Sequence, residues 1–188
     1  MDYLRRNFLF FSFVGMFFSC GNISSDSNQN EVVKEQVQAK GQSSVVDEVS
    51  DPNILQVALG SKDHTTLVVA VQAAGIEDVL VNAGPITVFA PVNAAFAALP
   101  DGTVESLILP KNKGKLTEVL THHAAPGTYN KKQLKKNAKK GRKIYTANND
   151  YLDVEVKDEE IYIGGAKVLG EVATSNGYII VIDKVLLP

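Results

Sequence analysis

Two adjacent histidines, His122 and His123, are the residues of this chain whose type most directly suggests chemistry. Imidazole binds metal ions and exchanges protons near neutral pH, so the pair raises the question of a metal centre. A metal site needs three or four ligands in one place, whereas adjacent helical residues point about 100° apart and His64 lies in a different predicted helix. We therefore expect no bound metal and no other cofactor.

A catalytic histidine also needs a positioned nucleophile and an acid that orients its ring. The chain has no G-x-S-x-G elbow, and Glu118 is the only acidic neighbour of the pair in the sequence. No catalytic residue is therefore predicted, and we expect the protein not to be an enzyme. The alternative is that His123 is a buried, hydrogen-bonded residue at a helix end that orients the Pro126-Gly127 turn.

A second group with chemical potential is basic. In the segment 131–143, "KKQLKKNAKKGRK", eight of 13 residues are basic: Lys131, Lys132, Lys135, Lys136, Lys139, Lys140, Arg142 and Lys143. A helix would gather the lysines on one stripe and turn Leu134 and Ala138 to the body. The stripe suggests contact with lipopolysaccharide, acidic polysaccharide or anionic membrane. The alternative is a solvated face that the six acids of residues 150–160 partly neutralise. No aromatic residue interleaves the lysines, so nucleic acid is not expected.

The N-terminus is predicted to carry an export signal. An apolar run of 11 residues, 8–18, follows Arg5 and Arg6 and is too short to span a bilayer. Cys20, the only cysteine, ends this region in a pattern that resembles a bacterial lipoprotein cleavage site, although Phe17 and Phe18 depart from it. The resemblance implies that residues 1–19 are removed and that Cys20 is lipidated. The alternative is an ordinary secretory signal.

Residues 20–46 are rich in Ser, Asn, Gln and Glu, which predicts a flexible tether. A single folded domain is expected over 47–188. The expected location is the bacterial envelope, with the outer membrane favoured by analogy because Gly21 is not an aspartate retention signal, or else the exterior.

The histidine pair and the basic segment are positioned by a domain whose predicted elements are mostly helices first and strands last. Segments before residue 125 have helical periodicity, except for the strand "ITVFA", which Pro91 is expected to stop before Asn93 caps a helix. Later segments alternate with period two, and Asn176-Gly177 predicts a tight turn. The order indicates an α+β fold. The apolar run "YIIVI" predicts a central strand buried on both faces, after which Asp183 must be hydrogen-bonded or lie at an edge.

Three segments together resemble the signatures of the fasciclin domain family: "TVFAPVNAAFAALP" (87–100), "LTHHAAPGTY" (120–129) and "SNGYIIVIDKVLLP" (175–188). The resemblance covers residues 45–188. It implies a β-wedge or two-sheet core with helices packed on one side. It also implies a set of structural signature positions: Asn93, Pro126, Gly127, Asn176, Gly177 and Asp183.

In the family's second signature a Tyr-His pair is usual, so His123 matches and His122 stands where tyrosine is expected. Because that pair has been linked to integrin contact in animal members, His122 and His123 are possible partner contacts. The resemblance implies a non-catalytic, monomeric envelope module, anchored to the membrane by its lipid, that binds a cell-surface or matrix protein or polysaccharide. The alternative is an envelope carrier of a small apolar ligand, similar to a carotenoid or lipid.

Overall fold

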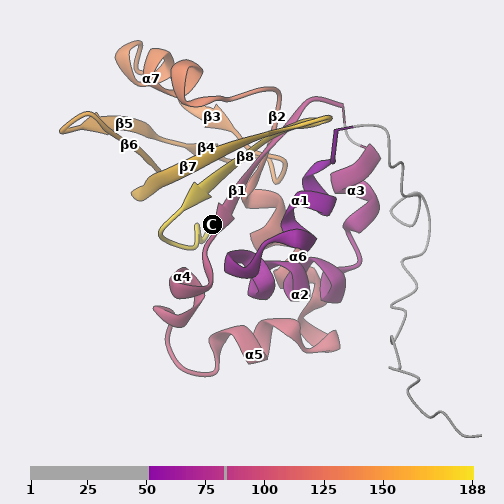
Figure 1. The fold of residues 1–188 in the computed structure, drawn as a ribbon. Coiled ribbons are helices and arrows are strands. Elements are labelled where there is room, and N and C mark those ends of the chain that lie inside the picture. The colour runs from indigo at the N-terminus through magenta and orange to yellow at the C-terminus, as the bar shows by residue number, and fades with distance from the viewer. Residues whose placement is uncertain (1–50, 83) are drawn as a thin grey trace, which may run out of the picture. The chain divides into compact units, whose positions relative to one another are not determined.

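The structure, a computed structural model, describes residues 51–82 and 84–188 (Figure 1). The predicted signal peptide, Cys20 and the tether lie outside these residues. The helices are α1 (Ile54–Gly60), α2 (Thr65–Ala74), α3 (Glu77–Asn82), α4 (Asn93–Ala97), α5 (Thr103–Ile108), α6 (Lys113–His122) and α7 (Lys131–Lys139), with 3-10 turns η2 (Lys62–His64) and η3 (Pro110–Asn112). The strands are β1 (Ile86–Pro91), β2 (Ala124–Pro126), β3 (Ile144–Tyr145), β4 (Tyr151–Leu152), β5 (Val154–Lys157), β6 (Glu160–Ile163), β7 (Ala166–Thr174) and β8 (Gly177–Ile182).

The main sheet is mixed and has the strand order β2-β1-β8-β7-β6-β5, while β3 and β4 form a separate ribbon. Strands β1 and β8 run parallel, with Val88 opposite Ile179, and the other pairs are antiparallel. The prediction that "YIIVI" forms a central strand is confirmed, because β8 lies between β1 and β7 and is buried along most of its length. Its apolar residues are continuous because both faces of the strand pack against protein.

Each face of the sheet has its own core. On β1, Val88 and Ala90 join a cluster with residues of α1, α2, α3 and α6. The intervening Phe89 faces a second cluster that contains Leu134 of α7 and Ile144 of β3. The predicted α+β fasciclin-like fold is confirmed, with one difference in the arrangement of helices. Helix α7 packs on the face opposite the other helices, as Figure 1 shows, because the apolar side of its basic sequence supplies Leu134.

The prediction that the strand stops at Pro91 is confirmed, since Pro91 is the last residue of β1 and still lies opposite Ile182. The prediction about the start of α4 was wrong. Asn93 is not the N-cap of α4, because Val92 occupies that position. In the part of the chain that the structure describes, no helix has the length and apolar character needed to cross a bilayer.

Candidate functional site

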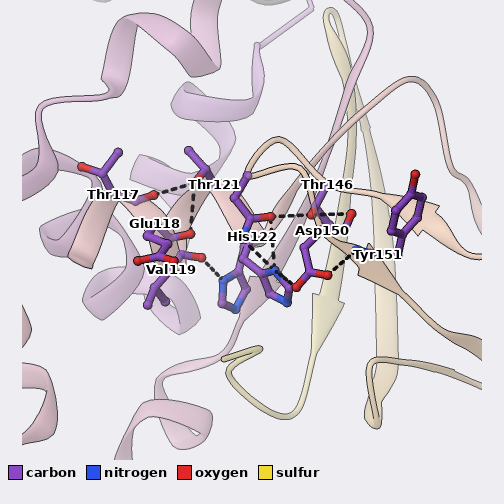
Figure 2. Close-up of polar contacts among 10 residues, drawn as sticks. Thr117, Glu118, Val119, Thr121, His122, Thr146, Asp150 and Tyr151 are labelled. Carbon is purple, nitrogen blue, oxygen red and sulfur yellow. Dashed lines mark hydrogen bonds and ion pairs between the residues drawn. The ribbon is translucent and has the colours of Figure 1, made fainter. Parts of the chain in front are cut away.

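Helix α6 brings both histidines to its C-terminal end, with His122 as the last helical residue and His123 as the C-cap. Both residues are buried, each with a relative exposure of 3%. The two rings have different partners. The ring of His122 lies beside Asp150, and the ring of His123 bonds to the backbone carbonyl of Val119 in the preceding turn (Figure 2). The pair is therefore two separate polar contacts rather than one site.

His123 joins helix α6 to the C-terminal tail. The backbone N–H of Leu186 donates to His123 Nε2 at 2.9 Å, so this nitrogen must be unprotonated. The proton is then on Nδ1, which donates to the Val119 carbonyl at 2.8 Å. Burial lowers the pKa of His123 to about 4, partly opposed by the Val119 hydrogen bond and reinforced slightly by the neighbouring His122. The residue is thus a neutral structural link at physiological pH.

His122 joins helix α6 to the loop between β3 and β4. Its Nδ1 lies 3.1 Å from Asn148 Nδ2 and 3.5 Å from Asp150 Oδ2. The loop is held in turn by the buried Thr146, whose hydroxyl lies 2.6 Å from Asn148 Oδ1 (Figure 2). Burial and these contacts do not fit the prediction that His122 and His123 touch a partner, because neither ring is presented at the surface.

The geometry also offers no metal centre in the described residues. No three His, Cys, Asp or Glu side chains within residues 51–82 and 84–188 gather where they could hold one ion. His64 is separate from the pair and bonds through Nδ1 to the Ser61 hydroxyl at 2.7 Å.

The predicted Asn-Gly turn has a different construction. Ser175 and Asn176 form the centre of the β7–β8 turn, and Gly177 is already the first residue of β8. Asn176 instead connects the turn to the helices, since its Oδ1 accepts from the Ile54 N–H at 3.1 Å and its Nδ2 donates to the Leu80 carbonyl at 2.6 Å. The asparagine is therefore needed for long-range contacts rather than for the shape of the turn.

Asn93 also acts at a distance. Its Oδ1 accepts from the Thr66 N–H at 3.1 Å, and its Nδ2 donates to the Lys62 carbonyl at 2.9 Å. It thus satisfies an N-terminal amide of α2 from the neighbouring helix α4. At the other end of the fold, Asp183 follows β8 and accepts from the Lys167 N–H at 2.7 Å, which supplies the hydrogen bond that its position requires.

The Pro126-Gly127 turn depends on a residue that sequence reasoning missed. Pro126 ends β2 opposite Ile86, and Gly127 follows in the left-handed region with φ of 106°. The fully buried hydroxyl of Thr87 donates to the Gly127 carbonyl at 2.8 Å and accepts from the Tyr129 N–H at 2.9 Å. Thr87, and not His123, therefore makes the side-chain hydrogen bonds that hold this turn, in addition to the backbone bond from the Gly127 N–H to the Pro85 carbonyl at 2.7 Å. A buried threonine in a β-rich run carries no sequence signal for such a role.

Helix α7 presents the basic stripe as predicted by its periodicity. Leu134 is fully buried and Ala138 partly so, while the lysines line a shallow hollow of about 680 Å³ together with Glu171: Lys131, Lys132, Lys135, Lys136, Lys139 and Lys140. None of the ion pairs within the described residues involves these lysines. Arg142 is exposed, and Lys143 lies 3.1 Å from Asp153. We call the six lysines of α7 and its C-cap the basic stripe.

Comparison with known proteins decides the family. The model of the fasciclin domain matches residues 62–188. The chain belongs to the fasciclin domain family. It is 45% identical over 136 residues to the protein sll1483 of Synechocystis, an alignment that covers 72% of this chain and 73% of that protein.

Other relatives and a solved structure agree with this membership. The chain is 31% identical over 154 residues to the immunogenic protein MPB70 of Mycobacterium bovis, covering 79% of this chain and 75% of that one. It is 32% identical over 108 residues to the cell surface glycolipoprotein MPB83 of the same species, covering 57% of this chain and 46% of that protein. The fold matches a FAS1 domain pair from the insect cell adhesion molecule fasciclin I, with a TM-score of 0.53, 25% identity and coverage of 64% of this chain and 43% of that chain.

The fasciclin domain also contains an apolar cavity of about 290 Å³ between helices α2, α5 and α6. Its walls are mainly aliphatic, with Val104, Leu107 and Ile108 on the α5 side. The His123 ring lies at its edge, but both ring nitrogens already have partners, so the cavity offers no free charged group there. Helix α5 has no buried residue of its own, so it covers the cavity with side chains that are only half-buried.

Proposed function

We propose that this fasciclin domain is a non-catalytic binding module of the cell surface and that its basic stripe contacts polyanions such as acidic polysaccharide or lipopolysaccharide. A cell surface location is supported by the family and by relatives that include a cell surface glycolipoprotein and an insect cell adhesion molecule. Anchoring through a lipid on Cys20 is part of the proposal. Labelled palmitate should enter the natural chain but not a Cys20→Ala variant.

The observation that carries the proposal is that no lysine of the basic stripe forms an ion pair with a described residue. Four of the six acids of residues 150–160 have partners outside the stripe: Asp150 lies beside His122, Asp153 pairs with Lys143, and Glu155 and Glu160 pair with Lys157 and Lys167. Lys143 and Asp153 form the one ion pair between the two charged segments within the described residues, and none of the acids of residues 150–160 pairs there with a lysine of the basic stripe. Lysines gathered in this way produce a local positive potential that attracts anionic surfaces.

Reversing the charge of the stripe should abolish polyanion binding. A protein with Lys135, Lys136, Lys139 and Lys140 each changed to Glu should bind immobilised heparin or lipopolysaccharide about 100-fold more weakly or worse, since each lysine near an anionic surface contributes about 1 kcal/mol. Retention of the natural protein should fall as salt rises, because salt screens exposed charges. Elution salt and equilibrium binding measure both effects.

A matched control changes four exposed lysines elsewhere to Glu as well: Lys62, Lys111, Lys115 and Lys184. Its net charge equals that of the stripe variant, so it separates a local contact from the effect of total charge. If the two variants lose binding equally, or if the natural protein is not retained at low salt, the basic stripe is not a polyanion site.

The apolar cavity favours a second candidate, an envelope carrier of a small apolar ligand. An apolar cavity left empty costs about 24 cal/mol for each Å³, so a matching ligand would stabilise the fold. Organic extraction of the purified protein followed by mass spectrometry should then recover a stoichiometric apolar compound. An Ala70→Phe variant should lose the compound, because the new ring would occupy the cavity that Ala70 lines. Extracts without such a compound would remove this candidate.

A further inference from the structure

Strand β7 has an open edge. It is nine residues long and pairs with β8 from Val168 to Thr174. Its pairing with β6 involves only Ala166 and Lys167. Beyond Lys167, the side of β7 that faces away from β8 therefore has no strand neighbour among the described residues.

This edge has little protection against strand pairing. Edge strands usually carry proline, lysine or a bulge that discourages another strand from adding. The sequence 169–174, "LGEVAT", has neither proline nor lysine, and its protective features are the charged Glu171 and an irregularity in pairing between Val168 and Gly170. Leu169 and Val172 are 50% and 39% exposed, which leaves apolar surface beside the open edge.

The free backbone groups of the edge follow from the hairpin. Because the turn holds two residues, Thr174 and Gly177 are the first cross-strand pair, and such a pair exchanges hydrogen bonds. Bonding then alternates along an antiparallel pair, so Val172 bonds to β8 while Glu171 and Ala173 direct their N–H and C=O groups outward. These groups are the template on which a further strand would pair.

The basic stripe reaches this edge. The hollow that its lysines line also includes Glu171 of β7. The Glu171 carboxylate accepts from the Lys131 N–H at 2.6 Å, so the N-terminus of α7 already engages the one acidic side chain of the edge. A strand added to β7 would therefore run beside lysines that form no ion pair within residues 51–82 and 84–188.

We propose that the edge from Leu169 to Thr174 accepts an extended acidic peptide as an additional strand, with its carboxylates toward the basic stripe. Main-chain hydrogen bonds would supply affinity, as in other cases of strand addition, and the lysines would select an acidic partner. The ionic half of this inference rests on the proposed function of the stripe, whereas the backbone half rests on the open edge alone.

Two peptides of equal charge test the pairing: a hexapeptide of alternating Glu and Val, and one of alternating Glu and Pro. Proline cannot donate to a strand ladder, so only the first peptide can pair fully. We expect the Glu-Val peptide to bind the full chain about tenfold more tightly or better, a difference of about 1.4 kcal/mol. It should also slow hydrogen exchange of the Glu171 and Ala173 amides, measured by NMR, whereas the Glu-Pro peptide should not.

An Ala173→Pro variant should lose the preference for the Glu-Val peptide, while the control Ala173→Val, which keeps the N–H, should retain it. Should the proline variant not fold, amide exchange in the natural protein still decides the question. Equal binding of both peptides without protection would overturn the open-edge proposal, yet leave heparin retention, and hence the proposed function, intact. If the Glu171 and Ala173 amides become protected from exchange when the protein concentration is raised without any peptide, the added strand is a second copy of this chain. That result would also overturn the proposal of an acidic peptide.

Discussion

Replacing Gly177 by alanine should lower the free energy of unfolding by about 3 kcal/mol, at the upper end of ordinary point mutations. A β-carbon at this position would overlap the carbonyl oxygen of Ile86 and lie 2.8 Å from its carbon. The obstacle is main chain rather than the end of a flexible side chain, so β1 and β8 would have to separate where Ile86 pairs with Gly177. Urea unfolding at neutral pH measures the loss.

Gly170→Ala is the matched control, because it adds the same methyl group to the adjacent strand. Its β-carbon would meet only the Val181 side chain, at 3.8 Å, so we expect a change below about 1 kcal/mol. If the two variants unfold at the same urea concentration, close contact between the backbones of β1 and β8 is not what requires glycine at 177.

The second large effect is a loss of stability in acid that depends on His123. Its pKa is about 4 in the folded protein and about 6.5 when the chain is unfolded. Between these values the unfolded state binds more protons, so stability falls as pH decreases from about 7 to 4. At about 1.4 kcal/mol per pKa unit, the loss is about 3 kcal/mol. Protonation removes the acceptor of the Leu186 N–H, which links the C-terminal tail to α6.

A His123→Gln variant isolates this contribution. Carboxylates also titrate in this range, and burial lowers the pKa of His64 in the same direction, so the natural protein alone gives a composite curve. Subtracting the curve of the variant removes those shared contributions. The difference between the two should shrink as pH falls from 7 to 4. A constant difference across this range would show that His123 does not titrate below its unfolded value.

Local patterns in the sequence predicted much of the fold. Hydrophobic periodicity placed the strand from Ile86 and the helix that carries Leu134. Local patterns failed at Asn93, whose partners are distant in sequence: its Oδ1 accepts from the Thr66 N–H, 27 residues before it, and its Nδ2 donates to the Lys62 carbonyl, 31 residues before it. Propensity describes a residue and its neighbours, and neither contact is local.

The sequence by itself determined the fold class, the family and the amphipathic character of the basic helix, because each depends on the order and spacing of residue types. Only the tertiary structure decided what His122 and His123 do, since their partners Asp150 and Leu186 are brought to them by folding. It also decided that Asp153, Glu155 and Glu160 form ion pairs away from the basic stripe and that β7 keeps an open edge among the described residues. Burial, ion pairing and strand neighbours are properties of contacts between distant segments, and a linear pattern does not contain them.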